Sequence, residues 1–216
     1  MTKVDVTQKA DIRCFLGAPG TGKSHATKAE IKKARRCLVW DLEDEYTDLE
    51  AVTIAGLPRR LHQAGAGAFK LRVIPSPDAA KRQVEFDLVC RTIMEIGKMT
   101  FVAEELRFVT QPSKAPAGWA AITLRGRKRG VKVIGTSQRP ASIDKDFLGS
   151  ATLIRCGALN YPEDRTAVAR VMGIPEMAIT ALEGHEVIEW TRTPRQVKGP
   201  PRLNSIAGMA DMLAKA

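Results

Sequence analysis

Aromatic residues make up only 5% of this sequence, and no apolar run approaches the roughly 20 residues that a membrane-spanning helix needs. The first residues, Met-Thr-Lys-Val-Asp-Val, also lack the apolar stretch of a secretory signal. We therefore expect a protein without a transmembrane segment. At 216 residues the chain is long enough for one α/β domain with a sizeable core.

Cysteine and histidine are scarce, with four and three residues. The cysteines, each in an apolar stretch and far from the others, are Cys14, Cys37, Cys90 and Cys156. Without a C-x-x-C pair they indicate reduced core thiols of a cytosolic protein rather than metal ligands. His185 has no second His or Cys at metal-binding spacing, so we interpret it as a surface strand residue.

Acidic residues are fewer than basic ones: the sequence has 24 Asp and Glu and 34 Lys and Arg, which gives a net charge of +10. Such an excess favours a polyanionic partner. The densest positive cluster spans residues 125–130, Arg-Gly-Arg-Lys-Arg-Gly. A cluster of this kind is either a solvated face or a patch that binds a polyanion.

The sequence is organised around residues 17–24, Gly-Ala-Pro-Gly-Thr-Gly-Lys-Ser, which match the phosphate-binding pattern G-x-x-x-x-G-K-[ST]. An expected strand (12–16) precedes them and an expected helix (25–33) follows. Glycines let consecutive N–H groups face the phosphates of a nucleoside triphosphate, at the positive end of the helix dipole. Lys23 would reach the β- and γ-phosphates, and Ser24 would hold Mg²⁺. The predicted nucleotide-binding residues are Gly17, Ala18, Pro19, Gly20, Thr21, Gly22, Lys23, Ser24 and His25.

A second chemical element is the strand-like stretch 99–103, which ends in Glu104 and Glu105. This is the pattern of a Walker B motif, where the first acid serves Mg²⁺ and the second polarises the attacking water. Asp is the commoner first acid, so the longer arm of Glu104 has to be accommodated. The alternative is an ordinary strand that runs into a charged turn.

Two further strands end in polar residues. The expected strand 37–40 leads into Asp41 and Glu45, at the sheet edge where open α/β sheets bind ligands; a solvated acidic turn is the alternative. The expected strand 131–136 leads to Gln138, whose amide could hydrogen-bond the γ-phosphate and the attacking water.

The remaining pattern alternates strands and helices, which predicts an α/β fold with a mostly parallel sheet. We expect a strand at 71–74 and a helix from about 78 to 97, capped by Asp78 and with Val84 and Leu88 among its apolar positions. Residues 47–69 indicate loops around at most a short helix, with 57–60 in a loop.

We divide the chain into a domain that carries the phosphate loop, 1–190, and a basic, Pro-rich extension, 191–216. The expected elements after residue 160 are two helices and one strand: 164–172, 175–182 and 185–190. A short amphipathic helix at 205–216 would be marginal alone and should dock on its own core or on a neighbouring subunit.

Together these motifs resemble the HerA/FtsK superfamily of ring-forming, DNA-pumping ATPases. The resemblance covers roughly residues 12–170. Its features, in order, are the phosphate loop, Asp-x-x-x-Glu-Tyr (41–46), strand-Glu-Glu, Gly-Arg-Lys-x-Gly-Val (126–131) and Thr-Ser-Gln-Arg-Pro (136–140). The last two are the most discriminating.

The resemblance implies a P-loop NTPase of the RecA/ASCE type: a three-layer sandwich with core strand order 5-1-4-3-2, using ATP and Mg²⁺. Lys23, Glu105 and Gln138 would be catalytic, and Glu104 would join Ser24 at the metal. The expected partners are double-stranded DNA, bound without sequence preference, and further copies of the chain in a ring.

Size narrows the resemblance. The sequence has neither the N-terminal barrel nor the C-terminal winged helix of larger relatives, so it looks like the genome-packaging ATPases of tailless icosahedral viruses with internal membranes. That would place it in the host cytoplasm or at the packaging vertex of the virion, with capsid or membrane-associated packaging proteins as partners.

A neighbouring subunit should complete such a site, because charge on the transferred phosphoryl group needs a further cation. Arg127 is the first candidate and Arg155 the second, whereas Arg139 follows Gln138 so closely that it should support its own subunit. Arg127 could instead contact DNA or solvent.

Three alternatives stay open. A P-loop small-molecule kinase would need acceptor and lid segments and would gain nothing from Glu105 or Gln138. A nucleotide-dependent switch would keep the loop without needing Glu105. Within the superfamily, a plasmid-transfer or filamentous-virus export motor is also compatible with the motifs.

Overall fold

The computed structural model describes residues 9–192, in which eight strands form one sheet. The strands are β1 (Ile12–Leu16), β2 (Arg36–Trp40), β3 (Glu50–Ala51), β4 (Phe69–Val73), β5 (Met99–Ala103), β6 (Val131–Ser137), β7 (Leu153–Gly157) and β8 (Val187–Thr191). Their order is β3-β4-β2-β5-β6-β1-β7-β8. All neighbours pair in parallel except β7 and β8, so the expected mostly parallel sheet is confirmed. Read from β7 to β2, the five central strands are β7-β1-β6-β5-β2, which corresponds to 5-1-4-3-2 along the chain.

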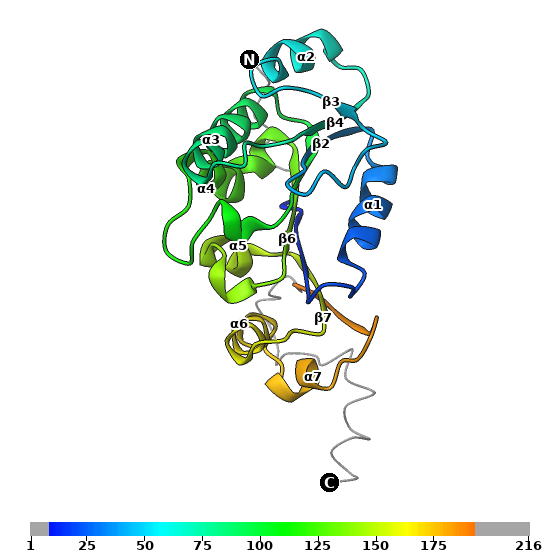
Figure 1. The fold of residues 1–216 in the computed structure, drawn as a ribbon, viewed down its shortest axis with the longest axis vertical. Helices are drawn as coiled ribbons and strands as arrows, with labels where there is room; N and C mark the ends of the chain where they lie inside the picture. The colour runs from blue at the N-terminus through cyan, green and yellow to red at the C-terminus, as the bar shows by residue number, and fades with distance from the viewer. Residues whose placement is uncertain (1–8, 193–216) are drawn as a thin grey trace.

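Helices cover both faces of the sheet (Figure 1), which makes three layers. The helix α1 lies on one face, and α3, α4 and α5 lie on the other. The α-helices are α1 (Lys23–Lys33), α2 (Leu57–Ala64), α3 (Ala79–Ile96), α4 (Ala117–Arg125), α5 (Lys145–Ser150), α6 (Pro162–Met172) and α7 (Glu176–Thr180); the short 3-10 helices are η1 (Leu106–Phe108), η2 (Gly126–Arg129) and η3 (Pro140–Ser142).

Alternate residues of the central strands pack against the two helical layers. On the α1 face, Phe15, Val39, Val102 and Ile134 form a small buried cluster with Ile31 of α1. The opposite face holds the larger core, in which most of the few aromatic rings gather. The centroids of Trp40 and Phe86 are 5.0 Å apart, and those of Trp119 and Phe147 are 4.9 Å apart. Most of the scarce aromatic side chains therefore stabilise the core on the face of the sheet opposite to α1.

Several element boundaries differ from those expected. Residues 57–60, which we expected in a loop, open the helix α2; that expectation was wrong because Pro58 lies in the first turn, where its missing N–H costs no hydrogen bond. The strand expected at 71–74 begins at residue 69. The expected helix at 78–97 is α3, and Asp78 caps it by accepting a hydrogen bond from the Lys81 N–H. Two of its apolar side chains, Val84 and Leu88, are exposed rather than in the core.

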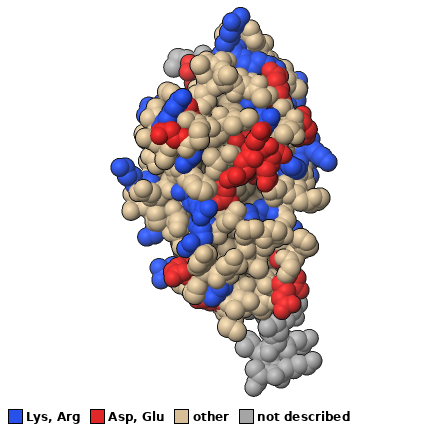
Figure 2. Space-filling view, in the orientation of Figure 1, with Lys and Arg blue, Asp and Glu red and all other residues tan. Residues whose placement is uncertain are grey.

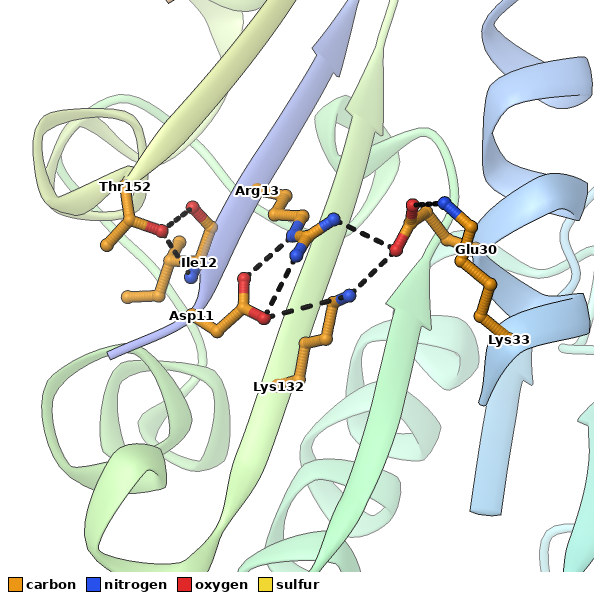
Figure 3. Close-up of polar contacts among 7 residues, drawn as sticks. All are labelled: Asp11, Ile12, Arg13, Glu30, Lys33, Lys132 and Thr152. Atoms are coloured by element: carbon orange, nitrogen blue, oxygen red, sulfur yellow. Dashed lines mark hydrogen bonds and ion pairs between the residues drawn. The ribbon is translucent and has the colours of Figure 1, made fainter. Parts of the chain in front are cut away.

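An ion-pair network joins α1 to the sheet (Figure 3). The Glu30 carboxylate of α1 accepts hydrogen bonds from Arg13 of β1 at 2.9 Å and from Lys132 of β6 at 2.8 Å. Arg13 also pairs with Asp11 at 2.7 Å. Burial opposes the ionisation of Glu30, but hydrogen bonds from Lys132 and Lys33 outweigh it and lower its pKa to about 2. The network fixes the helix that follows the phosphate loop.

The four cysteines are buried thiols without disulfide bonds, as expected. Within residues 9–192, no helix has the length and apolar character that crossing a bilayer requires. The strand β8 ends at Thr191, and the predicted terminal helix at 205–216 lies outside the described residues. The strand expected at 185–190 begins only at Val187, so that His185 lies in the preceding turn.

Candidate nucleotide-binding site

The carboxyl ends of β1, β2, β5 and β6 meet at one edge of the sheet, because these strands are parallel. A cavity of about 330 Å³ opens there. Its lining residues are Pro19, Gly20, Gly22, Lys23, Ser24, His25, Glu43, Glu45, Glu104, Glu105, Thr136 and Gln138. Four segments that are far apart in the sequence therefore share one pocket.

The phosphate loop curls between β1 and α1. Gly20 and Gly22 have φ angles of 79° and 85°, a left-handed conformation that glycine adopts without a steric penalty. No side chain caps the N-terminus of α1, whose first N–H groups lie beside the pocket with Gly22 and Ser24. This is the geometry by which a helix N-terminus binds phosphate.

Lys23 lies in the first turn of α1 and lines the pocket. Its Nζ donates hydrogen bonds to the carbonyl oxygens of Gly17 at 2.7 Å and Ala18 at 2.9 Å. Burial lowers the pKa of Lys23, although the negative charges of Glu105 and Glu104 oppose that change. The ammonium group is therefore held at the loop and faces carboxylates across the pocket.

Glu104 follows the last residue of β5 and is 5% exposed. The hydroxyl of Tyr46, a residue that is 1% exposed, donates a hydrogen bond to its Oε1. Burial is the main reason that the pKa of Glu104 is raised, to about 7. The hydrogen bond from Tyr46 opposes that rise, and neighbouring carboxylates add to it.

Glu105 has a φ angle of 45°, which is uncommon outside glycine. Its N–H donates to Oγ1 of Thr136 at 3.1 Å, and its Oε2 accepts from the N–H of Gln138 at 3.4 Å. Arg107 of η1 lies 3.7 Å from the same oxygen. Burial raises the pKa of Glu105, and these donors oppose that rise. A strained backbone fixed by neighbours is a recurring feature of functional sites.

Asp41, at the end of β2, is fully buried and does not line the pocket. Its carboxylate accepts the backbone N–H groups of Glu45 at 2.9 Å and Tyr46 at 3.1 Å. Arg72 of β4 donates to it at 2.9 Å. Asp41 thus shapes the loop that brings Glu45 to the pocket.

Most of the predicted site residues meet in this pocket. Three residues of the phosphate loop do not line the pocket: Gly17, Ala18 and Thr21. The Thr21 hydroxyl donates a hydrogen bond to the Ala18 carbonyl oxygen at 2.8 Å. Neither Arg127 nor Arg155 lines the pocket. Arg127 lies in η2, which precedes β6 and therefore lies at the opposite edge of the sheet.

Arg155 and Arg139 each have an ion-pair partner in their own chain. Arg155 of β7 pairs with Glu189 of β8. Arg139 pairs with Asp164 of α6 at 2.7 Å, and its guanidinium lies 3.8 Å from the centroid of the Tyr161 ring.

Sequence reasoning missed several residues of the site. Glu43 and Thr136 line the pocket, and Tyr46 and Arg107 contact the two Walker B acids. His185 is exposed, as expected, but its Nδ1 is 3.9 Å from where a Cβ on Gly22 would lie, so it sits beside the phosphate loop. Glu43 and Tyr46 belong to the acidic segment after β2, and Thr136 belongs to the Thr-Ser-Gln-Arg-Pro motif, but the sequence did not predict what these side chains contact.

The oxygen donors around Ser24 and Glu104 suit Mg²⁺, a hard cation that prefers carboxylate, hydroxyl, phosphate and water oxygens. Within residues 9–192, no three His, Cys, Asp or Glu side chains are grouped so that they could hold a metal by themselves. Mg²⁺ at nucleotide sites usually takes only one or two carboxylates and completes its shell with phosphates and water. Ser24 and Glu104 fit that mode.

Acidic side chains gather on the face of the molecule in Figure 2. The loop after β2 contributes exposed carboxylates, those of Glu43, Asp44, Glu45 and Asp48. Two of them, Glu43 and Glu45, line the pocket together with Lys23, and the charge of Glu45 acts on the Lys23 ammonium group. A polyphosphate entering this pocket would be repelled by the carboxylates unless a divalent cation accompanied it.

Comparison with known proteins supports the architecture. No family model matches the chain. The chain is 27% identical over 173 residues to Protein P9 of Pseudoalteromonas phage PM2, and the match covers 78% of each sequence. The genome packaging NTPase B204 of Sulfolobus turreted icosahedral virus 2, solved with AMPPCP, superposes with a TM-score of 0.66 at 14% identity, covering 84% of this chain and 92% of that one.

A second solved structure, VirB4 of Thermoanaerobacter pseudethanolicus, superposes with a TM-score of 0.59 at 12% identity, covering 86% of this chain and 90% of that one. At identities this low, the two superpositions establish the fold and nothing beyond it. With the phosphate loop in its expected place, the chain has the α/β fold of a P-loop NTPase, similar to that of viral genome-packaging NTPases.

Proposed function

We propose that this protein is a Mg²⁺-dependent ATPase that drives double-stranded DNA through a ring of its own copies, and that it packages a viral genome. The observation that carries the ATPase part is the position of Glu105. Its carboxylate lies in the same pocket as Lys23 and Gln138, and its backbone is fixed in a left-handed conformation. A carboxylate so placed can orient and polarise water for attack on a γ-phosphate.

Each pocket residue has a distinct role in this proposal. Lys23 and the N–H groups at the start of α1 bind the phosphates, and Ser24 and Glu104 hold Mg²⁺. Bound Mg²⁺ would supply charge neutralisation at the β- and γ-phosphates. Gln138 is joined to Glu105 through its backbone N–H, and in this proposal its side-chain amide would bind the γ-phosphate and the attacking water.

The DNA and packaging part rests on the net charge of +10 and on the relatives. B204 of Sulfolobus turreted icosahedral virus 2 is described as a genome packaging NTPase and has been solved with AMPPCP and ATP-gammaS. The proposal includes action in the infected host cell, with a capsid vertex or membrane-associated packaging proteins as partners. A P-loop kinase would not require Glu105 and Gln138 at the pocket.

The test measures ATPase activity with and without double-stranded DNA, and DNA affinity as a function of salt. We expect stimulation by DNA of any sequence. Because phosphate contacts release counterions, the affinity should fall by roughly 10³–10⁵ between 50 and 200 mM salt if 6–10 phosphates are held. ATPase activity without DNA stimulation, or an affinity that is independent of salt, would favour a kinase or a switch.

A further inference from the structure

The first Walker B acid of this chain is Glu104, one methylene longer than the commoner Asp. The structure shows which residue contacts this longer side chain. The Tyr46 hydroxyl donates a hydrogen bond to Oε1 of Glu104, and both side chains are buried. Glu104 also lines the pocket, so its second carboxylate oxygen, Oε2, would be the one available to a metal ion there.

We infer that Tyr46 is a positioning residue for the Mg²⁺ site: by holding one oxygen of Glu104, it fixes the carboxylate that the metal needs. The inference rests on the proposed function, since it assigns Glu104 to Mg²⁺. A partner that orients a metal ligand commonly changes metal affinity by roughly 10–100-fold when it is removed.

Tyr46 is itself held by a chain of contacts that begins on β4, the strand beside β2. Asp41 accepts the Tyr46 backbone N–H at 3.1 Å, and Arg72 of β4 donates to Asp41 at 2.9 Å. Arg72 also pairs with Asp44 in the same loop. With the backbone fixed at both Asp41 and Tyr46, the hydroxyl is held in one place relative to β5.

The ring of Tyr46 is fixed as firmly as its backbone. It packs in the buried cluster beneath α1 with Val39 and Val102, and Nζ of Lys28 lies 5.3 Å from its centroid. Tyr46 therefore touches the helix that follows the phosphate loop as well as the first Walker B acid. It joins the metal ligand to the phosphate-binding element.

The test is Tyr46→Phe, which removes the hydroxyl and keeps the ring. Binding of AMPPCP is measured by titration calorimetry, in EDTA and over a series of Mg²⁺ concentrations. We expect the affinity in EDTA to stay within about twofold of wild type. The Mg²⁺ concentration that half-maximally strengthens binding should rise by roughly 10–100-fold.

The matched control is Tyr161→Phe. Tyr161 is the other tyrosine of the chain, is 47% exposed and does not line the pocket. It should leave the Mg²⁺ titration unchanged. An unchanged titration for Tyr46→Phe, or a loss of affinity that is equally large in EDTA, would overturn the inference, because the second result describes a general structural role.

Glu104→Asp provides a second, independent measurement. The shorter carboxylate should not reach the Tyr46 hydroxyl, so adding Tyr46→Phe to Glu104→Asp should change the Mg²⁺ dependence by less than twofold. Full additivity of the two substitutions would overturn the inference. Wild-type protein that binds AMPPCP without any response to Mg²⁺ would instead remove the proposed function, and this inference with it.

Discussion

The backbone N–H of Gln138 donates a 3.4 Å hydrogen bond to Oε2 of Glu105, which joins the end of β6 to the end of β5 at the pocket. These two residues are 33 positions apart in the sequence. The hydrogen bonds of the Lys23 side chain go instead to the carbonyl oxygens of Gly17 and Ala18. In the proposed mechanism, nucleotide binding and hydrolysis depend on different residues, so we expect substitutions to separate the two.

Glu105→Gln should keep ATP binding and lose turnover, because the carboxylate is needed only when water attacks. We expect a fall in kcat of roughly 10²–10⁴-fold, as for the loss of a general base. Lys23→Ala should instead abolish nucleotide binding, since its ammonium group meets the phosphates. Calorimetry and phosphate release measure the two properties. Normal turnover by Glu105→Gln would shift the hydrolytic role to Glu104.

Gly135→Ala should destabilise the fold. A Cβ on Gly135 of β6 would lie 2.5 Å from Cζ of Phe147 and 2.6 Å from Cδ1 of Leu106, so core side chains must move. Overpacking of this kind typically costs roughly 1–3 kcal/mol in free energy of unfolding, measured here by urea denaturation.

The matched control for that substitution is Gly149→Ala in α5, where within residues 9–192 nothing beyond the chain neighbours and the helix's own backbone lies within 4 Å of the added Cβ. There alanine favours the helix, and the free energy of unfolding should rise by roughly 0.4–1 kcal/mol. Equal effects of the two substitutions would contradict the close packing of β6 against Phe147.

The ion-pair network beneath α1 predicts a pH-dependent contribution to stability. The pKa of Glu30 is lowered in the fold to about 2 from a model-peptide value of 4.5. The ionised form is thus favoured by folding, and its contribution is fully present above about pH 4.5 and lost as the pH falls towards 2.

Glu30→Gln should therefore cost roughly 1–3 kcal/mol in free energy of unfolding at pH 7, because Arg13 and Lys132 lose their anionic partner. The difference from wild type should shrink between pH 4.5 and 3. Glu95→Gln, an exposed position on α3, is the control and should change little at either pH. A difference that is constant with pH would argue against an ionised Glu30 as the source.

Much of the site could be predicted from the sequence because its residues follow strands. The phosphate loop, Glu104, Glu105 and Gln138 each come directly after an apolar stretch, and a parallel sheet brings such positions to one edge. Tyr46 entered the sequence pattern without a role, and Arg107 was not predicted, because their contacts with Glu104 and Glu105 depend on how two loops fold over the sheet edge. Sequence spacing carries no signal for that.

The helix α2 and the exposed Val84 and Leu88 show a different limit. Residues 57–60 contain Pro58, which in the first turn is compatible with a helix, so a proline there does not indicate a loop. For α3, apolar periodicity predicted the helix but not which side of it packs. The buried side is set by α4, which packs along α3 and presents Trp119 to Phe86.

The location of Arg127 gives the last prediction. Arg127 lies in η2, before the start of β6, whereas the phosphate loop lies beyond the far end of that strand. A seven-residue strand spans roughly 23 Å at about 3.3 Å per residue, so Arg127 cannot reach the phosphates of its own subunit. If Arg127 acts on a γ-phosphate, that phosphate has to be bound by a neighbouring subunit.

If Arg127 acts in this way, Arg127→Ala should lower ATPase activity by roughly 10³–10⁵-fold while leaving nucleotide binding intact. Arg127→Ala subunits keep a complete phosphate loop, and Lys23→Ala subunits keep Arg127. Mixed assemblies of the two should therefore recover activity that neither protein has alone, measured as phosphate release against the mixing ratio.

The comparison variant is Arg155→Ala, which removes the ion pair with Glu189 between β7 and β8. In the same mixing experiment it should give no complementation if Arg127, and not Arg155, is the residue that acts on the neighbouring site. Recovery with Arg155→Ala but not with Arg127→Ala would exchange the two assignments. No recovery with either, in mixtures shown to co-assemble, would mean that each subunit hydrolyses ATP without an arginine from its neighbour.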